Sequence, residues 1–572
     1  MPATRRAGAA GAVLLGAIVL WASPAWSHAV LLRTEPAPQT TVDTAPAAVR
    51  LNFSEPVEVT FGAVRVFDVD GNRVDSGAIS RSDGNRQVVV PADFTEGTYT
   101  VTWRVTSADG HPVRGGFGFF VVRPSTISAV AVPVDTGPPA VVTLGYGVAR
   151  FLWFSAIMAI VGLVAARRWV WTPAVTDAGL GASPAADGFR RTFRRAVPAS
   201  WAVLVVSGGA VLVFQAATVS GLSLAESARP VVLSDLLGTS FGRLWRVQMA
   251  LALLMGLPVA ALVARRRLLG APPRAWIAVG AVVAAGLCGA TALNGHARTF
   301  AAPAVVVPSL ALHLLAAGVW AGGLGALAVL GSSAWRRLPA PDRPALLALL
   351  VRRFGRLAAA SAGVVAVTGT VVAAGGFGAV SDLWEVTFGR LVAAKVALLA
   401  VALALAAGHR WRTTSQLAQP ATAGPAVSSF ERTSRAEVLV LAGAVALAAT
   451  LVALVPGRSL ALAARGPVNQ ENRAGDYVVH LYIDPTRLGE NEVHVTFVTD
   501  RGLAAAEVAN LEVTLTTPDG SSQALEPRLI SPGHFVADTD FAAPGLYGLD
   551  VSTPSVEGLS TTFDFRLRDG GQ

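Results

Sequence analysis

The sequence contains very little cysteine or lysine, and each shortage excludes a class of protein. The single Cys288 excludes an intrachain disulfide framework and any site built from several thiolates. Lys395 is the only lysine, and it lies inside an apolar run, so the chain has no glycine-rich phosphate-binding loop of the Lys-Ser/Thr type. An Asp-Lys-Thr-Gly phosphorylation motif is also missing, which excludes a P-type ATPase. We therefore expect no nucleotide as a partner.

Charged residues are scarce as well, and apolar residues are abundant. Only 15% of the residues are charged, 52% are hydrophobic and the mean hydropathy is +0.52. A chain this apolar is expected to cross a lipid bilayer. The net charge is +9, but the arginines fall in short clusters between apolar runs and not on one soluble face. No nucleic acid is therefore expected as a partner.

The apolar runs predict an α-helical bundle of about eight transmembrane helices within residues 140–460, because a helix needs about 20 residues to span a bilayer. The runs lie near residues 140–166, 196–217, 245–264, 274–293, 304–331, 354–375, 389–408 and 435–456. Arginine clusters follow the first, third, fifth and seventh runs. Arginine-rich loops stay in the cytoplasm, so we expect a multi-pass protein of a bacterial cytoplasmic membrane with both terminal domains outside the cell.

Two regions of soluble composition flank the predicted bundle. Residues 28–124 contain short β-rich segments separated by turns, which predicts an all-β sandwich of the cupredoxin or immunoglobulin type. Residues 125–139 are expected to form a linker. Residues 466–572 alternate in the manner of strands and predict a C-terminal all-β domain. The predicted fold class is a multidomain membrane protein with one β-domain before the bundle and one after it in the sequence.

Residues 1–27 have the features of a secretory signal peptide. Two arginines precede an apolar run, and small residues stand at Ala25 and Ser27, where a signal peptidase requires them. Cleavage after Ser27 would make His28 the first residue of the mature chain, with a free α-amine beside its imidazole. The pKa of such an amine is about 7.7–8, so a metal ion displaces its proton at little cost near neutral pH.

A second set of ligand types lies at Asp109-Gly110-His111. Together with His28 it offers two imidazoles, an amine and a carboxylate, a set that suits the tetragonal geometry of Cu(II). The methionines lie outside this domain, at Met1, Met158, Met249 and Met255. Thioether ligation of Cu(I) is therefore excluded there, and we predict a site for Cu(II) only.

The N-terminal domain resembles the CopC family of periplasmic copper-binding proteins. The matching stretches are His28–Val30, Thr34–Ala37, Leu51–Pro56, Gly97–Val105 and Ser107–Val113. The resemblance implies that Cu(II) is bound by the amine and imidazole of His28 and by the imidazole of His111. It also implies that Asp109 is an axial or nearby ligand and that Glu55 is a nearby carboxylate.

The membrane region resembles the CopD family. The matching stretches are Asn294–Ala297, His313–Leu324, Phe388–Leu391 and Lys395–Val396. Ionisable groups inside a span are costly and usually face a pathway or the bundle interior. We therefore expect His296 and His313 to form a second copper site near the outer membrane face, with hydrogen bonding inside the bundle as the alternative. Gly318 and Gly322 are four residues apart and predict a close approach of two helices.

We expect the remaining histidines not to bind metal. His409 ends the seventh span and is expected at the cytoplasmic interface. The C-terminal domain resembles YtkA-like β-domains, on Gly489–Asn491 and on Gly533–Phe535 with the turn that follows. Its histidines are separate in the sequence, so they are expected at the surface, at His480, His494 and His534.

Together these features predict a copper-transport or copper-resistance protein, not an enzyme. The outer domain captures Cu(II), and the bundle moves it across the membrane or passes it on. A copper-donor or copper-acceptor protein is expected as a partner. An outer capture site favours uptake over export. Two alternatives stay open. An N-terminal histidine with a second histidine also describes histidine-brace copper monooxygenases, and a membrane-tethered copper sensor would need the same outer domain.

Overall fold

The computed structural model describes residues 29–567 except 30, 39, 60–63, 70–71, 77–78, 108–111, 124–138, 265–272, 301, 455, 457–467, 485, 500–504 and 506. The predicted signal peptide, His28, Asp109 and His111 lie outside the described residues. The described residues form two β-domains and one helical bundle.

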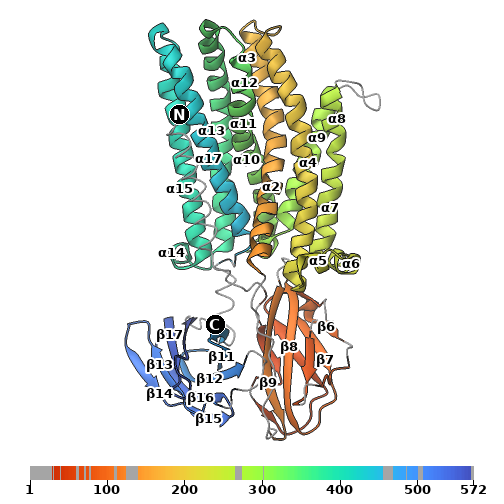
Figure 1. Cartoon of the computed structure of the whole chain (residues 1–572), viewed down its shortest axis with the longest axis vertical. Helices are drawn as coiled ribbons and strands as arrows, with labels where there is room; N and C mark the ends of the chain where they lie inside the picture. The colour runs from red at the N-terminus through yellow and green to blue at the C-terminus, as the bar shows by residue number, and fades with distance from the viewer. Residues whose placement is uncertain are drawn as a thin grey trace. The chain divides into compact units, whose positions relative to one another are not determined.

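The N-terminal domain is a two-sheet β-sandwich, which confirms the predicted fold. One sheet has the order β1 (Leu31–Glu35), β3 (Ala48–Phe53), β7 (Gln87–Pro91) and β6 (Ser80–Ser82). The other has the order β2 (Thr41–Val42), β9 (Pro112–Val121), β8 (Gly97–Ser107) and β4 (Val57–Glu58), with β5 (Val64–Phe67) also paired to β8 (Figure 1). Alternate residues of β3 and β7 are buried, as a strand with one covered face requires. Leu51 and Val88 of one sheet join Val101 and Phe119 of the other in a single core.

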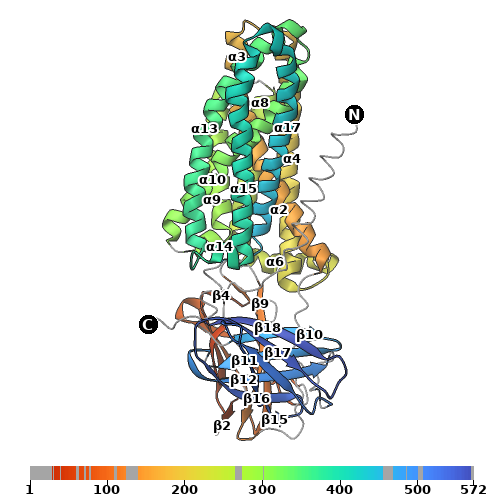
Figure 2. The same ribbon diagram turned by 90° about the vertical axis from the view of Figure 1, so that its left-hand side faces the viewer.

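The helical bundle contains eight helices in the described part of the chain that are long and apolar enough to cross a membrane, as predicted. They lie side by side along one axis (Figures 1 and 2). Their main segments are α2 (Ala140–Ala165), α4 (Pro184–Ser220), α7 (Ser240–Leu254) with α8 (Gly256–Ala264), α9 (Pro273–Leu293), α10 (Pro303–Ala317), α13 (Arg343–Gly376), α15 (Thr387–Gly408) and α17 (Pro420–Leu451). The shorter helices are α3 (Thr172–Asp177), α5 (Leu224–Ser227), α6 (Pro230–Gly238), α11 (Gly323–Ala326), α12 (Ser332–Trp335), α14 (Asp382–Glu385) and α16 (Thr414–Leu417).

Three of the spans contain π-helical turns. The turns are η2 (Ala166–Trp171) in the first span, η4 (Gly318–Gly322) and η5 (Leu327–Gly331) in the fifth, and η7 (His409–Thr413) in the seventh. A π turn inserts an extra residue into the helix, and such turns are frequent at functional sites. The η4 turn packs against α2 so closely that a Cβ on Gly322 would overlap the carbonyl oxygen of Met158. The predicted close helix approach at Gly318 and Gly322 is therefore confirmed.

The C-terminal domain is also a two-sheet β structure, as predicted. One sheet has the order β10 (Val468–Ala474), β11 (Tyr477–Asp484), β12 (Gly489–Thr499), β16 (His534–Phe541) and β15 (Arg528–Ser531). The other has the order β14 (Ser522–Leu525), β13 (Glu512–Thr516), β17 (Gly545–Ser552) and β18 (Ser560–Leu567). Val479 and Phe535 of the first sheet pack with Leu515 and Phe563 of the second in one core.

Candidate functional site

Glu55 is the residue of the predicted outer copper site that the structure describes. It is half-buried and lies between the end of β3 at Phe53 and the start of β4 at Val57. Phe53 pairs with Leu31, the first residue of β1. Val57 pairs with Ser107, the last residue of β8. Paired Cα atoms of neighbouring antiparallel strands are about 4.5–5.5 Å apart, and Glu55 is two residues from each of these pairs along the chain.

The predicted ligands are close neighbours of these strand ends in the sequence. His28 precedes Leu31 by three residues, and Asp109 and His111 follow Ser107 by two and four residues. The described strands therefore bring the segment that follows His28 and the segment that precedes Asp109 close to the stretch that contains one carboxylate, Glu55. The ligand set itself stays a prediction.

The two predicted membrane ligands each have a hydrogen-bond partner inside the bundle. Buried His296 begins the short η3 turn (His296–Arg298), and its Nε2 is 2.9 Å from the carbonyl oxygen of Val452. Nδ1 of His313 on α10 is 3.1 Å from Oγ1 of Thr368 on α13. His313 lies ten residues into α10, about 15 Å along the helix axis. The structure thus places the two histidines at different depths, with different partners.

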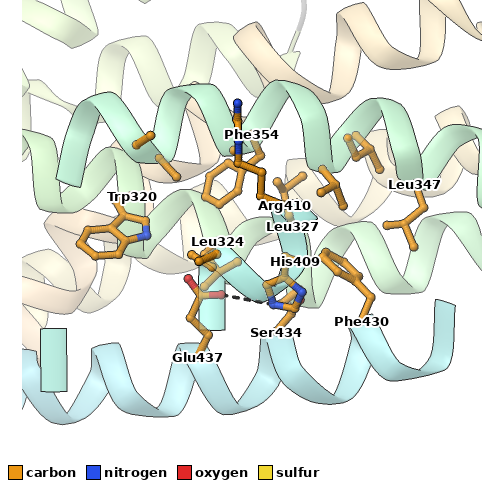
Figure 3. Close-up of a pocket in the computed structure, with 18 of the residues that line it drawn as sticks. Trp320, Leu324, Leu327, Leu347, Phe354, His409, Arg410, Phe430, Ser434 and Glu437 are labelled. Atoms are coloured by element: carbon orange, nitrogen blue, oxygen red, sulfur yellow. Dashed lines mark ion pairs between the residues drawn. The ribbon is translucent and has the colours of Figure 1, made fainter. Parts of the chain in front are cut away.

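His409 is a buried polar residue whose position the sequence did not reveal. Only 8% of its surface is exposed, so it packs against neighbouring helices, and its place at the cytoplasmic interface stays a prediction. Its Nε2 is 3.4 Å from Oε2 of Glu437 on α17, which is 1% exposed (Figure 3). Ser434 lies one turn before Glu437 and is equally buried. Within the described part of the chain, the Nε2 of His409 and the Oγ of Ser434 have no hydrogen-bond partner.

His409, Ser434 and Glu437 line a cavity of about 230 Å³ inside the bundle. Figure 3 shows the three side chains together, with apolar residues such as Phe354 forming much of the remaining wall. This volume exceeds what one water molecule needs, and the polar groups of His409, Ser434 and Glu437 stand in it among mostly apolar side chains. The lining residues Trp320, Leu327 and His409 belong to η4, η5 and η7, so three π turns contribute to one cavity.

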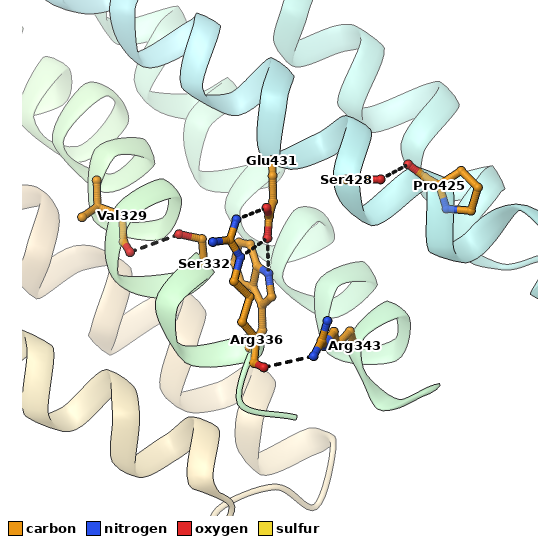
Figure 4. A network of polar contacts seen from close by, with 8 residues as sticks. Val329, Ser332, Arg336, Arg343, Pro425, Ser428 and Glu431 are labelled. Atoms are coloured by element: carbon orange, nitrogen blue, oxygen red, sulfur yellow. Dashed lines mark hydrogen bonds and ion pairs between the residues drawn. The ribbon is translucent and has the colours of Figure 1, made fainter. Parts of the chain in front are cut away.

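A polar network beside this cavity joins the fifth span to the eighth. Glu431 of α17 accepts a hydrogen bond from Nε1 of Trp335 at 3.0 Å and forms an ion pair with Arg336 (Figure 4). Arg343 donates to the carbonyl oxygen of Arg336 at 3.0 Å. Arg336 belongs to an arginine cluster predicted to be cytoplasmic, so the network lies at the predicted inner end of these spans.

Arg150 is a further buried charge that the sequence interpretation overlooked. It is 7% exposed on α2, and its guanidinium carbon is 4.0 Å from the centre of the Tyr146 ring. Its Nε and Nη1 have no hydrogen-bond partner among the described residues. Arg150 and Glu437 both fall inside predicted spans, and an ionisable residue there is itself a signal of function or of a polar bundle interior.

Three protein-family models match most of the chain between the first strand and the last span. The CopC domain matches residues 31–122. The N-terminal domain of copper resistance protein D-like proteins matches residues 141–304, and the copper resistance protein D family matches residues 348–451. The N-terminal β-sandwich and the membrane bundle are thus each assigned to a copper-resistance family.

Individual relatives agree with this assignment. The copper transport protein CutJ of Bacillus subtilis (strain 168) is 26% identical over 408 residues, which cover 71% of each chain. Copper resistance protein C of Xanthomonas campestris pv. juglandis is 32% identical over 117 residues, which cover 19% of this chain and 91% of that protein. The crystal structure of CopC from Methylosinus trichosporium OB3b is 30% identical, with a TM-score of 0.15, and the match covers 17% of this chain and 95% of that one. This chain therefore belongs to the copper resistance proteins that combine a CopC domain with a CopD membrane domain.

Proposed function

We propose that this protein takes up copper across the bacterial cytoplasmic membrane. In this proposal the outer domain captures Cu(II) with His28, His111 and Asp109 beside Glu55. The ion then passes to the membrane bundle, first at His296 and next at His313. The terminal domains lie outside the cell, so capture precedes passage through the bundle.

The observation that carries the proposal is the order of polar groups along the bundle, behind a CopC domain on the same chain. His296 lies before the start of α10, and His313 lies about 15 Å along it. The pair formed by His409 and Glu437 lines a cavity near the predicted inner end. Ionisable side chains are costly to keep in a bilayer, so three such positions at increasing depth support a pathway for a cation.

In the proposed pathway, His409 and Glu437 together form the innermost binding site for the ion. A neutral imidazole and a carboxylate are both ligand types that copper accepts. The 3.4 Å between His409 Nε2 and Glu437 Oε2 needs only a small side-chain movement to admit an ion between them. Among the described residues no three histidine, cysteine or acidic side chains stand at metal-binding distances, so an ion here would keep some waters.

The test is the copper content of cells that lack the protein, express it, or express variants. We expect expression to raise cell-associated copper, measured by mass spectrometry, and His28→Ala to return it to the level of cells without the protein. The double variant His296→Ala/His313→Ala should have the same effect, because it removes both proposed ion-binding positions nearer the outer membrane face. Val380→Ala, at a loop residue that is 78% exposed, is the matched control.

Three outcomes would count against the proposal. Unchanged accumulation in a well-expressed double variant would remove His296 and His313 from the pathway. Lower copper in expressing cells would reverse the direction and indicate export. Copper content that does not respond to expression at all would favour the sensor or the oxidative enzyme, and the enzyme predicts oxygen consumption by the copper-loaded protein with ascorbate.

A further inference from the structure

The C-terminal domain gathers its three histidines on three neighbouring strands. His480, His494 and His534 lie on β11, β12 and β16, which are adjacent in the first sheet. His480 pairs with Thr496, and Thr496 pairs with His534. His494 precedes Thr496 by two residues, so its side chain points to the same face. The separation of these residues in the sequence therefore conceals their proximity in the sheet.

This face of the sheet is distinct from the face that builds the domain core. The alternate residues Val479, Val495 and Phe535 of the same three strands belong to the core. The histidines point the other way, yet only 8% of His494 and 5% of His534 is exposed. The prediction of surface histidines is therefore wrong for these two residues, and a buried pair of imidazoles requires an explanation.

The separation of the two imidazoles matches the spacing of two ligands on one metal ion. Nδ1 of His494 is 3.2 Å from Nε2 of His534, and the ring planes differ by 17°. Imidazole nitrogens bind metals such as zinc at about 2.0–2.1 Å, so two of them at a tetrahedral angle stand about 3.3 Å apart. The same spacing also allows a hydrogen bond between two neutral rings, and the experiment below separates these cases.

We propose that the C-terminal domain binds one copper ion between His494 and His534, with His480 as the third ligand. His480 and His494 are diagonal neighbours on paired strands, about 7–8 Å apart, so rotation of the His480 side chain can bring its ring to the pair. In the described chain no three histidine, cysteine or acidic side chains already stand together at metal-binding distances, so this rotation is part of the proposal. Glu492 is 3.5 Å from Nε2 of His494, the ring nitrogen that does not face His534, so its carboxylate can orient the His494 ring. Imidazole sets also suit zinc, and the choice of copper rests on the proposed function.

The test compares copper bound at equilibrium by the purified full-length protein and by two variants. Each protein is loaded with copper sulfate, with and without ascorbate, desalted and analysed by mass spectrometry. We expect His494→Ala/His534→Ala to lose one copper per chain, and His480→Ala to bind that copper more weakly. Thr496→Val is the control, because it lies on the same face between the histidines, keeps the side-chain shape and removes no ligand.

The outcomes distinguish this proposal from the proposed transport function. Binding to the purified protein does not depend on transport, so a lost equivalent supports the site even where uptake by cells fails. Unchanged copper in a folded double variant would overturn the proposal and leave a hydrogen-bonded pair. Retention of zinc in preference to copper would overturn the choice of metal. If His494→Ala/His534→Ala does not fold, His534→Gln provides the same comparison with a neutral polar side chain.

Discussion

At the scale of single residues, the most unusual feature of the membrane bundle is the buried pair of His409 and Glu437. Removing a charged carboxylate from water costs several kcal/mol even after relaxation of the protein, and one neighbouring imidazole offsets only part of that cost. Two apolar side chains of similar size would pack the same cavity more stably. We therefore interpret the pair as a group kept for ion passage, in agreement with the proposed pathway.

Replacement of Glu437 by Gln should reduce copper uptake without loss of the folded protein. The amide keeps the size of the side chain and removes the charge that attracts a cation. Loss of one such group typically costs about 10–100-fold in metal affinity or activity, so we expect at least about tenfold slower copper accumulation in a time course. Leu439→Val is the control, because Leu439 follows Glu437 by two residues but is 57% exposed and does not line the cavity. Equal rates for wild type and Glu437→Gln would exclude this residue from the pathway.

At the scale of elements, the π turns decide which residues share a helix face. The sequence spacing from His313 to Trp320 is seven residues, which corresponds to one face of a regular helix. The η4 turn begins at Gly318, between these two residues, and adds one residue to the helical turn, and Trp320 within it lines the cavity with His409. The turn is stabilised by its contact with α2, where glycine allows the two backbones to touch.

Gly322→Ala should destabilise the bundle, because its new methyl group would overlap the backbone of Met158. Overpacking of this kind typically costs about 1–3 kcal/mol. We expect a lower melting temperature of the detergent-solubilised protein, measured by intrinsic tryptophan fluorescence. Gly325→Ala is the matched control, since a Cβ there meets nothing within 4 Å. A variant Gly322→Ala as stable as Gly325→Ala would show that α2 and η4 lie farther apart than described.

At the scale of the whole molecule, the proposed direction of copper movement depends on the orientation of the eight spans. Arginine-rich loops follow every second span, and the Glu431–Arg336 ion pair lies at the corresponding end of the bundle. The proposed uptake requires the CopC domain, His296 and the histidine face of the C-terminal domain to lie on the outer side. All of the proposed copper capture would then take place before the ion enters the bundle.

Cysteine labelling can test that orientation with little background. The single native Cys288 is fully buried, so a reagent that cannot cross membranes should not reach it. In intact spheroplasts we expect such a maleimide to label Val380→Cys, which lies between the sixth and seventh spans. Ala182→Cys, exposed between the first and second spans, should be labelled only after permeabilisation. The opposite pattern would invert the topology and the proposed direction of transport.

Much of the fold could be predicted because its signals are local. Apolar runs of about 20 residues predict spans, and a two-residue alternation predicts strands, wherever the rest of the chain lies. The copper families followed from short stretches such as Ser107–Val113, in which the ligand types stand close together in the sequence. The positions of His296 and His313 were also visible, as polar residues within or beside apolar runs.

The tertiary structure alone decided which distant residues meet. His494 and His534 are forty residues apart, and they meet because β16 pairs with β12 in one particular register. A register shifted by one residue would turn one of them to the core face. His409 and Glu437 meet because α15 packs against α17 and the η7 turn sets the direction of the histidine. Local sequence patterns contain neither strand register nor helix rotation, since both are fixed only when the elements pack.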